Sequence, residues 1–144
     1  MCGITAYAGN RPARELLLTG LEHLEYRGYD SAGVALQRTG GDVHTVRAVG
    51  PLAALRDAVG ETGGDAVCGI GHTRWATHGG VTEANAHPHA DHAERVHVVL
   101  NGIVENHAEL WSGPRRSETD AEVVAQLLGR EPGPLHEAVA RVNA

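Results

Sequence analysis

Apolar and polar positions follow two periods along the first 75 residues. Leucines at helical spacing predict an amphipathic helix over residues 12–26, and a shorter apolar face predicts a second helix over residues 51–59. Runs of small and β-branched apolar residues predict strands at residues 3–8, 32–37, 43–49 and 66–73. Because residues 39–42 read Thr-Gly-Gly-Asp, the second and third of these strands are expected to form a hairpin.

The periodic pattern weakens after residue 74. Residues 74–93 are polar and rich in glycine and histidine, and a loop of this length in a folded domain is usually functional or disordered. A strand is expected at residues 96–100 and a short helix at 106–111. A longer helix should begin at a capping box formed by Thr119 and Glu122, and a last amphipathic helix should span residues 135–142. Together the elements predict one α+β domain, or part of one, over residues 1–144.

Composition and charge exclude several functional classes. The formal net charge is −6 with no offsetting run of lysine and arginine, so we expect no nucleic-acid partner. We also expect no membrane partner, because no apolar stretch could span a bilayer, and the N-terminus lacks the pattern of a signal peptide. Two cysteines, Cys2 and Cys68, do not make a disulfide framework, so a cytoplasmic, reducing compartment is expected.

Cys2 is the first candidate for chemistry. Once Met1 is removed, one residue carries both a thiol and a free α-amine, whose pKa of about 7.7–8.0 leaves a neutral fraction that can act as a base. A nucleophile and base on one residue need no separate triad, as with an N-terminal threonine. The alternative is an inert thiol that follows Met1 by chance. A retained Met1 would acylate the amine and remove the base.

A dense polar cluster at residues 72–79 begins at the end of the strand predicted at residues 66–73. Arg74 presents a planar fork of donors that suits a carboxylate. Thr77 and His78 add directional hydrogen-bonding groups nearby. The alternative is a solvated loop arginine with no ligand.

Two later positions carry a structural and a functional interpretation each. Asn101 and Gly102 follow a predicted buried strand, where an amide side chain and a backbone N–H could form an oxyanion hole; an ordinary hairpin turn is the alternative. Asp120 lies in the first turn of a predicted helix, where it either caps the helix or receives a substrate ammonium group.

Three histidines in the long loop raise the question of a metal site. Pro88 interrupts the run of His87, His89 and His92, and the segment lacks the helical pair of histidines with a general-base glutamate that is typical of many zinc enzymes. We therefore expect solvated loop histidines and no metal.

Six motifs occur in one order along nearly the whole chain. They read Met-Cys-Gly-Ile at 1–4, Leu-Glu-Tyr-Arg-Gly-Tyr-Asp-Ser-Ala-Gly at 24–33, Gly-His-Thr-Arg-Trp-Ala-Thr-His-Gly at 71–79, Asn-Ala-His-Pro-His at 85–89, Asn-Gly-Ile-Val-Glu-Asn at 101–106 and Ser-Glu-Thr-Asp at 117–120. Together they resemble the glutaminase domain of isomerising glutamine–fructose-6-phosphate aminotransferases, which are class II glutamine amidotransferases of the N-terminal-nucleophile hydrolase superfamily. Tyr29 favours this group over relatives that make phosphoribosylamine or asparagine. The resemblance implies a four-layer αββα sandwich in which Cys2 opens a central strand.

The resemblance also implies a role for each candidate residue. Cys2 would attack the side-chain amide of glutamine, form a γ-glutamyl thioester and release ammonia. The other roles would be oxyanion stabilisation by Asn101 and Gly102, binding of the α-carboxylate end by Arg74, Thr77 and His78, binding of the α-ammonium by Asp120, and ammonia gating by Trp75. No cofactor is implied.

Three departures from the family pattern leave two functions open. The chain is shorter than the family's glutaminase domain and has no sugar-isomerase domain, the connection at residues 111–116 is short enough to move Asp120, and Leu100 stands where these synthases commonly carry histidine. One function is an enzyme that supplies ammonia to an acceptor such as fructose 6-phosphate on another domain or chain. The other is a truncated remnant that binds glutamine without hydrolysing it. Self-association is left open.

Overall fold

The first half of the molecule is a four-stranded sheet covered on one face by two helices. The computed structural model describes residues 1–76 and 79–142. Its strands β1 (Gly3–Ala8), β2 (Ser31–Gln37), β3 (Val43–Val49) and β4 (Cys68–Arg74) form an antiparallel sheet in the order β1-β4-β2-β3. Helices α1 (Ala13–Leu24) and α2 (Leu52–Val59) pack on it, and a 3₁₀ turn at Glu25–Arg27 continues α1.

The second half has little regular structure. Strands β5 (His89–Ala90) and β6 (His97–Val98) form a small antiparallel ladder. A short helix, α3 (His107–Leu110), is followed by α4 (Ala121–Arg130) and α5 (Leu135–Val142). Helix α4 packs against β5 and β6, and α5 packs against α4.

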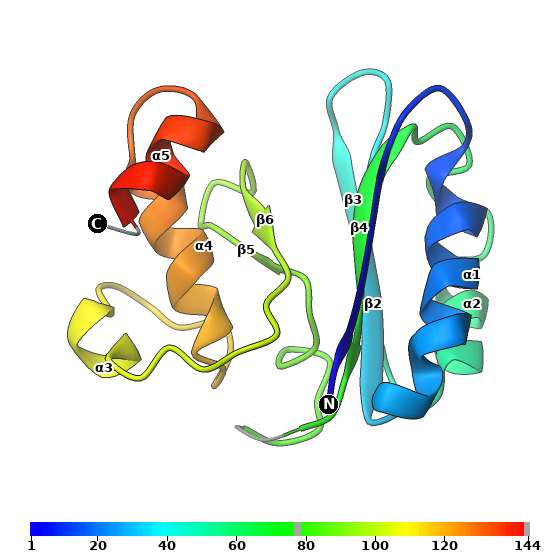
Figure 1. Ribbon diagram of the computed structural model, residues 1–144, viewed down its shortest axis with the longest axis horizontal. Helices are drawn as coiled ribbons and strands as arrows, with labels where there is room; N and C mark the ends of the chain where they lie inside the picture. Colours follow the sequence, from blue (N-terminus) through cyan, green and yellow to red (C-terminus); the bar gives the residue numbers. More distant parts are fainter. Residues whose placement is uncertain (77–78, 143–144) are drawn as a thin grey trace.

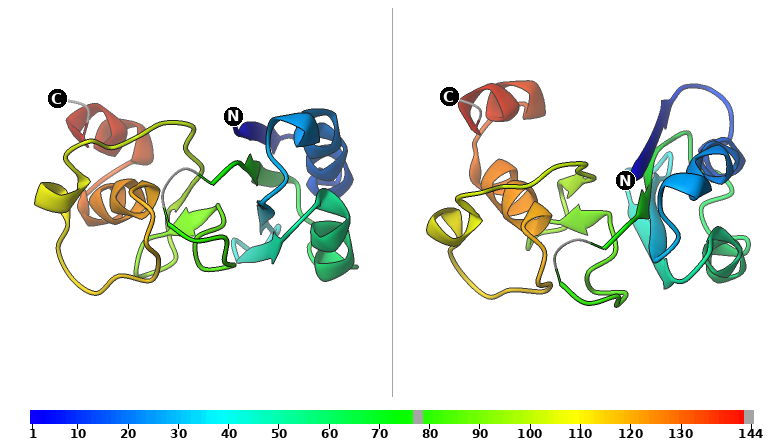
Figure 2. Two further views of the ribbon diagram at one scale, coloured as in Figure 1. Left: turned by 90° about the horizontal axis from the view of Figure 1, so that it is seen from below. Right: turned by 60° about the horizontal axis from the view of Figure 1, so that its bottom comes forward.

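The two halves stack as four layers. Figure 1 shows α1 and α2 on one side, then the four-stranded sheet, then β5 and β6, and then α4 and α5 on the far side. The two further views in Figure 2 keep the helical layers at opposite ends with both sheets between them. The expected α+β class and αββα layering are therefore confirmed, with the second sheet reduced to two strands among the described residues.

The apolar core lies between the four-stranded sheet and its two helices. Leucines and valines from α1, β2 and α2 fill it, and Leu17, Leu21, Val34, Leu36 and Leu55 are each at most 1% exposed. The helical period of α1 explains this packing, because residues three and four positions apart share the face that meets the sheet. This core fixes the frame on which the loops at the end of the sheet are held.

Two glycines let the loops lie directly on the sheet. A Cβ added at Gly33, on β2, would overlap the carbonyl oxygen of His87. A Cβ at Gly28 would lie 2.7 Å from the carbonyl carbon of Arg74 and 2.8 Å from the amide nitrogen of Trp75. Both positions need glycine because the approaching group is backbone, which cannot rotate away.

Several expected elements differ in the structure. Strand β1 lies at the edge of the described sheet, so the expectation that Cys2 opens a central strand is wrong for the described residues. The strand expected at residues 96–100 is only two residues long, and the loop at 74–93 contains β5. Polar side chains rather than long ladders hold this region, which accounts for the weak sequence signal.

The expected capping box is also wrong. Asp120 occupies the N-cap position of α4 and no side chain caps the helix. Thr119 Oγ1 instead lies 2.8 Å from His89 Nε2, and the carboxylate of Glu122 accepts hydrogen bonds from the backbone N–H and the hydroxyl of Ser117, both at 2.7 Å. Tertiary partners have replaced the local ones.

Candidate active site

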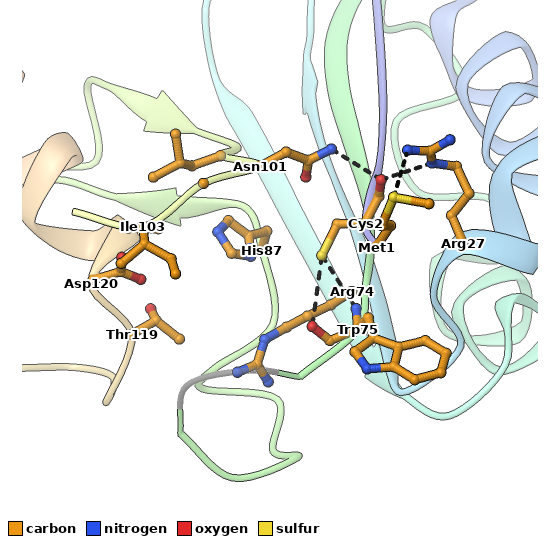
Figure 3. A pocket seen from close by; sticks show the side chains of 13 residues that line it. Met1, Cys2, Arg27, Arg74, Trp75, His87, Asn101, Ile103, Thr119 and Asp120 are labelled. Atoms are coloured by element: carbon orange, nitrogen blue, oxygen red, sulfur yellow. Dashed lines mark hydrogen bonds between the residues drawn. The ribbon is translucent and has the colours of Figure 1, made fainter. Parts of the chain in front are cut away.

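The antiparallel pairing of β1 with β4 brings Cys2 next to the polar cluster after β4. Gly3 is paired with Thr73, and its N–H donates to Thr73 Oγ1 at 3.2 Å. One residue further out, the N–H of Trp75 donates to Cys2 Sγ at 3.3 Å (Figure 3). Residues 73 positions apart in sequence therefore hold and orient the thiol.

The Asn101 side chain is fixed between the sheet and Cys2. Its Nδ2 donates to the carbonyl oxygen of Cys2 at 3.0 Å, and its Oδ1 lies 2.9 Å from Nε2 of His72 on β4. Arg27 Nε donates to the same carbonyl at 3.2 Å. When His72 carries its proton on Nε2, it donates to Asn101 Oδ1, and this contact orients the amide nitrogen of Asn101 towards Cys2. The hairpin interpretation of the turn at Asn101 is wrong, because no strand follows it among the described residues.

Asp120 is tied to the same turn from the other side. Its Oδ2 accepts a hydrogen bond of 2.6 Å from the N–H of Val104, and the side chain is buried. The loop that carries Asn101 is thus attached at one end to Cys2 and at the other to the start of α4. The short connection at 111–116 does not separate Asp120 from the other candidate residues.

Arg74 is a buried guanidinium at the end of β4. Only 4% of the residue is exposed, and its Nη1 donates to the carbonyl oxygen of Gly80 at 3.1 Å. Burial lowers the pKa of Arg74 below its ordinary value, and the nearby groups that oppose this shift include Cys2 and Asp120. The solvated-loop interpretation of Arg74 is therefore wrong.

These residues line one cavity of about 360 Å³. Its wall includes six of the eight candidate residues, namely Cys2, Arg74, Trp75, Asn101, Gly102 and Asp120. The other two, Thr77 and His78, lie outside the described residues. The volume is within the range of about 300–1,000 Å³ that small-molecule sites have. Figure 3 shows Cys2 and Arg74 on the side of the four-stranded sheet and Asp120 across from them.

Trp75 lies at the rim of this cavity. It is 43% exposed, and its ring meets that of Tyr29 edge to face with 5.5 Å between the centroids. Asp30 holds the segment that follows β4, because its Oδ2 accepts a hydrogen bond from the N–H of Ala76 at 2.8 Å. Tyr29 and Asp30 therefore both contact the residues that follow β4.

The sequence reasoning missed several residues of the cavity wall. Arg27, His87, Ile103 and Thr119 line it as well. All four lie within the six sequence motifs, so their place in a motif is the only sequence feature that points to the cavity. The spacing of His87 in the sequence raises only the question of a metal ligand.

His87 and His89 are buried, so the expectation that they are solvated is wrong, whereas His92 is exposed. The rings of His72 and His87 stack with centroids 4.2 Å apart, and His89 meets His87 edge to face at 4.6 Å. Burial lowers the pKa of His72 to about 4, of His89 to about 3 and of His87 to about 2. Within residues 1–76 and 79–142, no group of three acidic, histidine or cysteine side chains is arranged to hold a metal.

Comparison with known proteins identifies the family. No family model matches the chain. The glutamine–fructose-6-phosphate aminotransferase of a Thermus thermophilus strain is 53% identical over 134 residues, which is 89% of this chain and 22% of that protein. The Streptomyces coelicolor enzyme of the same name is 52% identical over 91% of this chain and 22% of its own length. The enzyme of the same name from Leifsonia xyli is 49% identical over 99% of this chain and 25% of its own length.

The chain belongs to the family of the isomerising glutamine–fructose-6-phosphate aminotransferases. It spans about a quarter or less of the length of these aminotransferases and matches their glutaminase portion. The members of the family are glutamine amidotransferase enzymes. In the described part of the chain, no helix has the length and apolar character needed to cross a membrane.

Solved structures agree on the fold of this aminotransferase homologue. Glutamine phosphoribosylpyrophosphate amidotransferase from B. subtilis aligns with a TM-score of 0.81 over 98% of this chain and 32% of that chain, at 20% identity. A structure described as the allosteric regulatory enzyme of purine biosynthesis aligns with a TM-score of 0.83 over the same shares, at 21% identity. The chain therefore has the fold of the N-terminal-nucleophile hydrolases.

Proposed function

We propose that residues 1–144 form part of a type-2 glutamine amidotransferase domain that hydrolyses L-glutamine through a thioester on Cys2. The single observation that carries the proposal is the cavity of about 360 Å³ in which a thiol, a buried guanidinium and a buried carboxylate meet. A thiol is a nucleophile, and the two charged groups complement the two charges of an amino acid. The ammonia would pass to an acceptor such as fructose 6-phosphate on another domain or chain.

The proposed reaction has two steps. Cys2 Sγ attacks the side-chain amide carbon of glutamine, the C–N bond breaks, and the nitrogen leaves as ammonia with the thiol proton. Water then attacks the γ-glutamyl thioester, glutamate leaves, and the thiol is restored. The α-amine of Cys2 carries the protons in both steps, which requires removal of Met1.

Asn101 and Gly102 are the proposed donors to the oxyanion. The Nδ2 of Asn101 lies beside Cys2, where it donates to the carbonyl of that residue at 3.0 Å, and His72 holds the amide from behind at 2.9 Å. A preorganised donor of this kind stabilises charge that develops on the amide oxygen in the transition state. In our proposal Asn101 Nδ2 and the N–H of Gly102 together receive that charge.

The charged end of glutamine is assigned to two segments. Arg74 binds the α-carboxylate, with Thr77 and His78 of the same segment as further donors, and Asp120 binds the α-ammonium. The hydrogen bond from Val104 to Asp120 supports this assignment, because it holds the carboxylate at the cavity wall. Trp75, which lies at the cavity rim and contacts Cys2 through its backbone, is the proposed gate for ammonia.

A glutaminase assay tests this function. Protein with Met1 removed, verified by mass, is expected to release glutamate and ammonia from L-glutamine. Cys2→Ala should lower kcat by at least about a thousandfold, because it removes the nucleophile, and should change the thermal midpoint little, because the hydrogen bonds lost with it are the weak ones between sulfur and the backbone of Trp75. Cys68→Ala is the matched control and should keep the activity, since Cys68 lies at the start of β4 and does not line the cavity.

Two outcomes would contradict the proposal. Glutamate release that survives in Cys2→Ala would remove the assigned nucleophile. Tight glutamine binding with no release from the processed protein would favour the remnant that binds glutamine without hydrolysing it.

A further inference from the structure

His87 occupies a position that packing alone does not explain. Only 6% of the residue is exposed, and neither ring nitrogen has a hydrogen-bond partner among the described residues. A buried polar atom without a partner is unfavourable, and such an atom in a native structure calls for an explanation. An apolar ring of similar size would fill the same space without this cost.

The two neighbouring histidines show what His87 lacks. His72 on β4 is bonded through Nε2 to Asn101, and His89 on β5 is bonded through Nε2 to Thr119. His87 lies between them as the middle ring of the stack. Among the described residues, the outer rings have protein partners and the middle ring does not.

The middle ring also lines the cavity. His87 is part of its wall, and in Figure 3 its ring lies between the labelled side chains of Asn101 and Asp120. The backbone holds it there, because Gly33 admits the carbonyl of His87 directly against β2. Its environment keeps the ring uncharged, since burial and the nearby His72, His89, Arg74 and Arg47 lower its pKa to about 2.

We propose that His87 is a substrate-binding residue whose neutral imidazole makes a hydrogen bond to glutamine between its reacting amide and its charged end. This inference rests on the proposed function, because it takes glutamine as the ligand of the cavity. Both nitrogens are covered in the structure, so this hydrogen bond requires the ring to rotate about Cβ–Cγ, a soft torsion for histidine. The ring acts as a donor or acceptor and not as a general acid.

Three variants of the Met1-processed chain test the inference. His87→Phe keeps the stacked ring and removes both nitrogens, and His87→Gln restores hydrogen-bonding atoms. His92→Phe is the matched control, because His92 is an exposed histidine of the same segment outside the cavity. For each, KM and kcat for L-glutamine and the thermal midpoint are measured.

The expected result separates binding from stability. His87→Phe should raise KM about tenfold, as expected for one lost hydrogen bond, with kcat within about twofold and a thermal midpoint equal to or above that of the parent. His87→Gln should recover part of the KM, and His92→Phe should match the parent. A histidine with a purely structural role would instead lower the thermal midpoint when replaced.

The outcomes also separate this inference from the function on which it rests. A parent that hydrolyses glutamine, together with an unchanged KM in His87→Phe, would overturn the inference and leave the function standing. So would a fall in the thermal midpoint with an equal rise in KM in both His87 variants. A parent that neither binds nor hydrolyses glutamine would overturn both.

Discussion

The two halves of this molecule are stabilised by different interactions. Residues 1–74 bury leucine, valine and alanine between a regular sheet and two helices. Residues 79–142 bury a smaller apolar set, which includes Val123 and Leu128, and a larger polar set, which comprises Asn85, His87, His89, Asp91, Ser117, Thr119, Asp120, Glu122 and Gln126. The cavity lies where the two halves meet, so an apolar frame carries the thiol and a hydrogen-bonded network faces it.

The polar half depends on specific partners. Asn85 Nδ2 donates to the carboxylate of Glu118 at 2.8 Å, and the N–H of Glu118 donates back to Asn85 Oδ1 at 2.8 Å. Asp91 Oδ1 accepts from the backbone of Arg95 at 2.7 Å and of Val96 at 2.9 Å. Such networks specify one geometry when every member is satisfied and are costly when one is lost. The first half should therefore be most sensitive to the loss of apolar side chains, and the second half to acid and to the loss of polar groups.

Acid should have the largest effect, because it lowers the free energy of unfolding through the buried histidines where the two halves meet. The folded-state pKa values of His72, His87 and His89 lie at about 4, 2 and 3, below an unfolded value of about 6.5. The unfolded chain therefore binds more protons below pH 6.5, and stability falls as pH decreases from about 6.5 towards 4. Each histidine contributes a slope of about 1.4 kcal/mol per pH unit in the free energy of unfolding.

Chemical denaturation at pH 7, 6 and 5 measures that slope. His87→Phe removes one of the three groups, so its slope should be smaller than that of the parent, by a difference that approaches about 1.4 kcal/mol per pH unit below pH 6. Identical pH dependence in parent and variant would contradict a neutral, buried His87 in the folded state.

Truncation of the apolar frame should have the next largest effect. Leu55 on α2 is completely buried, so Leu55→Ala should lower the free energy of unfolding by about 2–5 kcal/mol through lost burial and a new cavity. Leu135→Ala on α5 is the control, because Leu135 is 55% exposed and should cost far less. Equal losses in urea denaturation would argue that the apolar core is not concentrated in the first half.

Loss of the cavity's guanidinium should act on substrate and not on the frame. Arg74→Ala should raise KM for L-glutamine by an amount equivalent to about 2–4 kcal/mol, since a desolvated, charge-assisted contact is removed. Arg38→Ala is the control, because Arg38 is exposed and pairs with Asp65 at 2.9 Å away from the cavity. Equal turnover of glutamine and its decarboxylated analogue by the parent would contradict the role of Arg74.

A single-atom change in the polar network should have the smallest effect. Glu122 is 1% exposed, and its carboxylate accepts from the N–H and hydroxyl of Ser117 and from the N–H of Arg116. Glu122→Gln replaces one accepting oxygen with an NH₂ group, which should cost about 1–3 kcal/mol of unfolding free energy. The exposed Glu105→Gln should be neutral in the same measurement. An unchanged free energy of unfolding in Glu122→Gln would contradict this prediction, because it would show that the network tolerates a lost acceptor.

The sequence predicted the frame well because its signals are local. The strands 3–8 and 43–49 match their predicted bounds, and the helix expected at 51–59 spans Leu52–Val59, since period and turn residues decide them. Strand β5 was not predicted, and β6 is shorter than the strand expected at residues 96–100, because side chains distant in sequence hold this region. Thr119 shows the same limit, since its hydroxyl contacts His89 instead of capping α4.

The candidate site was predictable as a set of motifs and not as a geometry. Pattern alone indicated Cys2, Arg74, Asn101 and Asp120, but only antiparallel pairing and the Asp120–Val104 hydrogen bond bring them to one cavity. The burial of His87 was missed, because a polar loop composition indicates solvent and not a ring packed on Gly33.

Covalent labelling by an electrophilic glutamine analogue tests the central claim most directly. The Met1-processed chain is treated with the analogue, and modified residues are located by mass spectrometry. The account predicts modification of Cys2, none of Cys68, and protection by L-glutamine, because only Cys2 shares a cavity with Arg74 and Asp120. Equal labelling of both thiols, or labelling of Cys2 that L-glutamine does not slow, would contradict it.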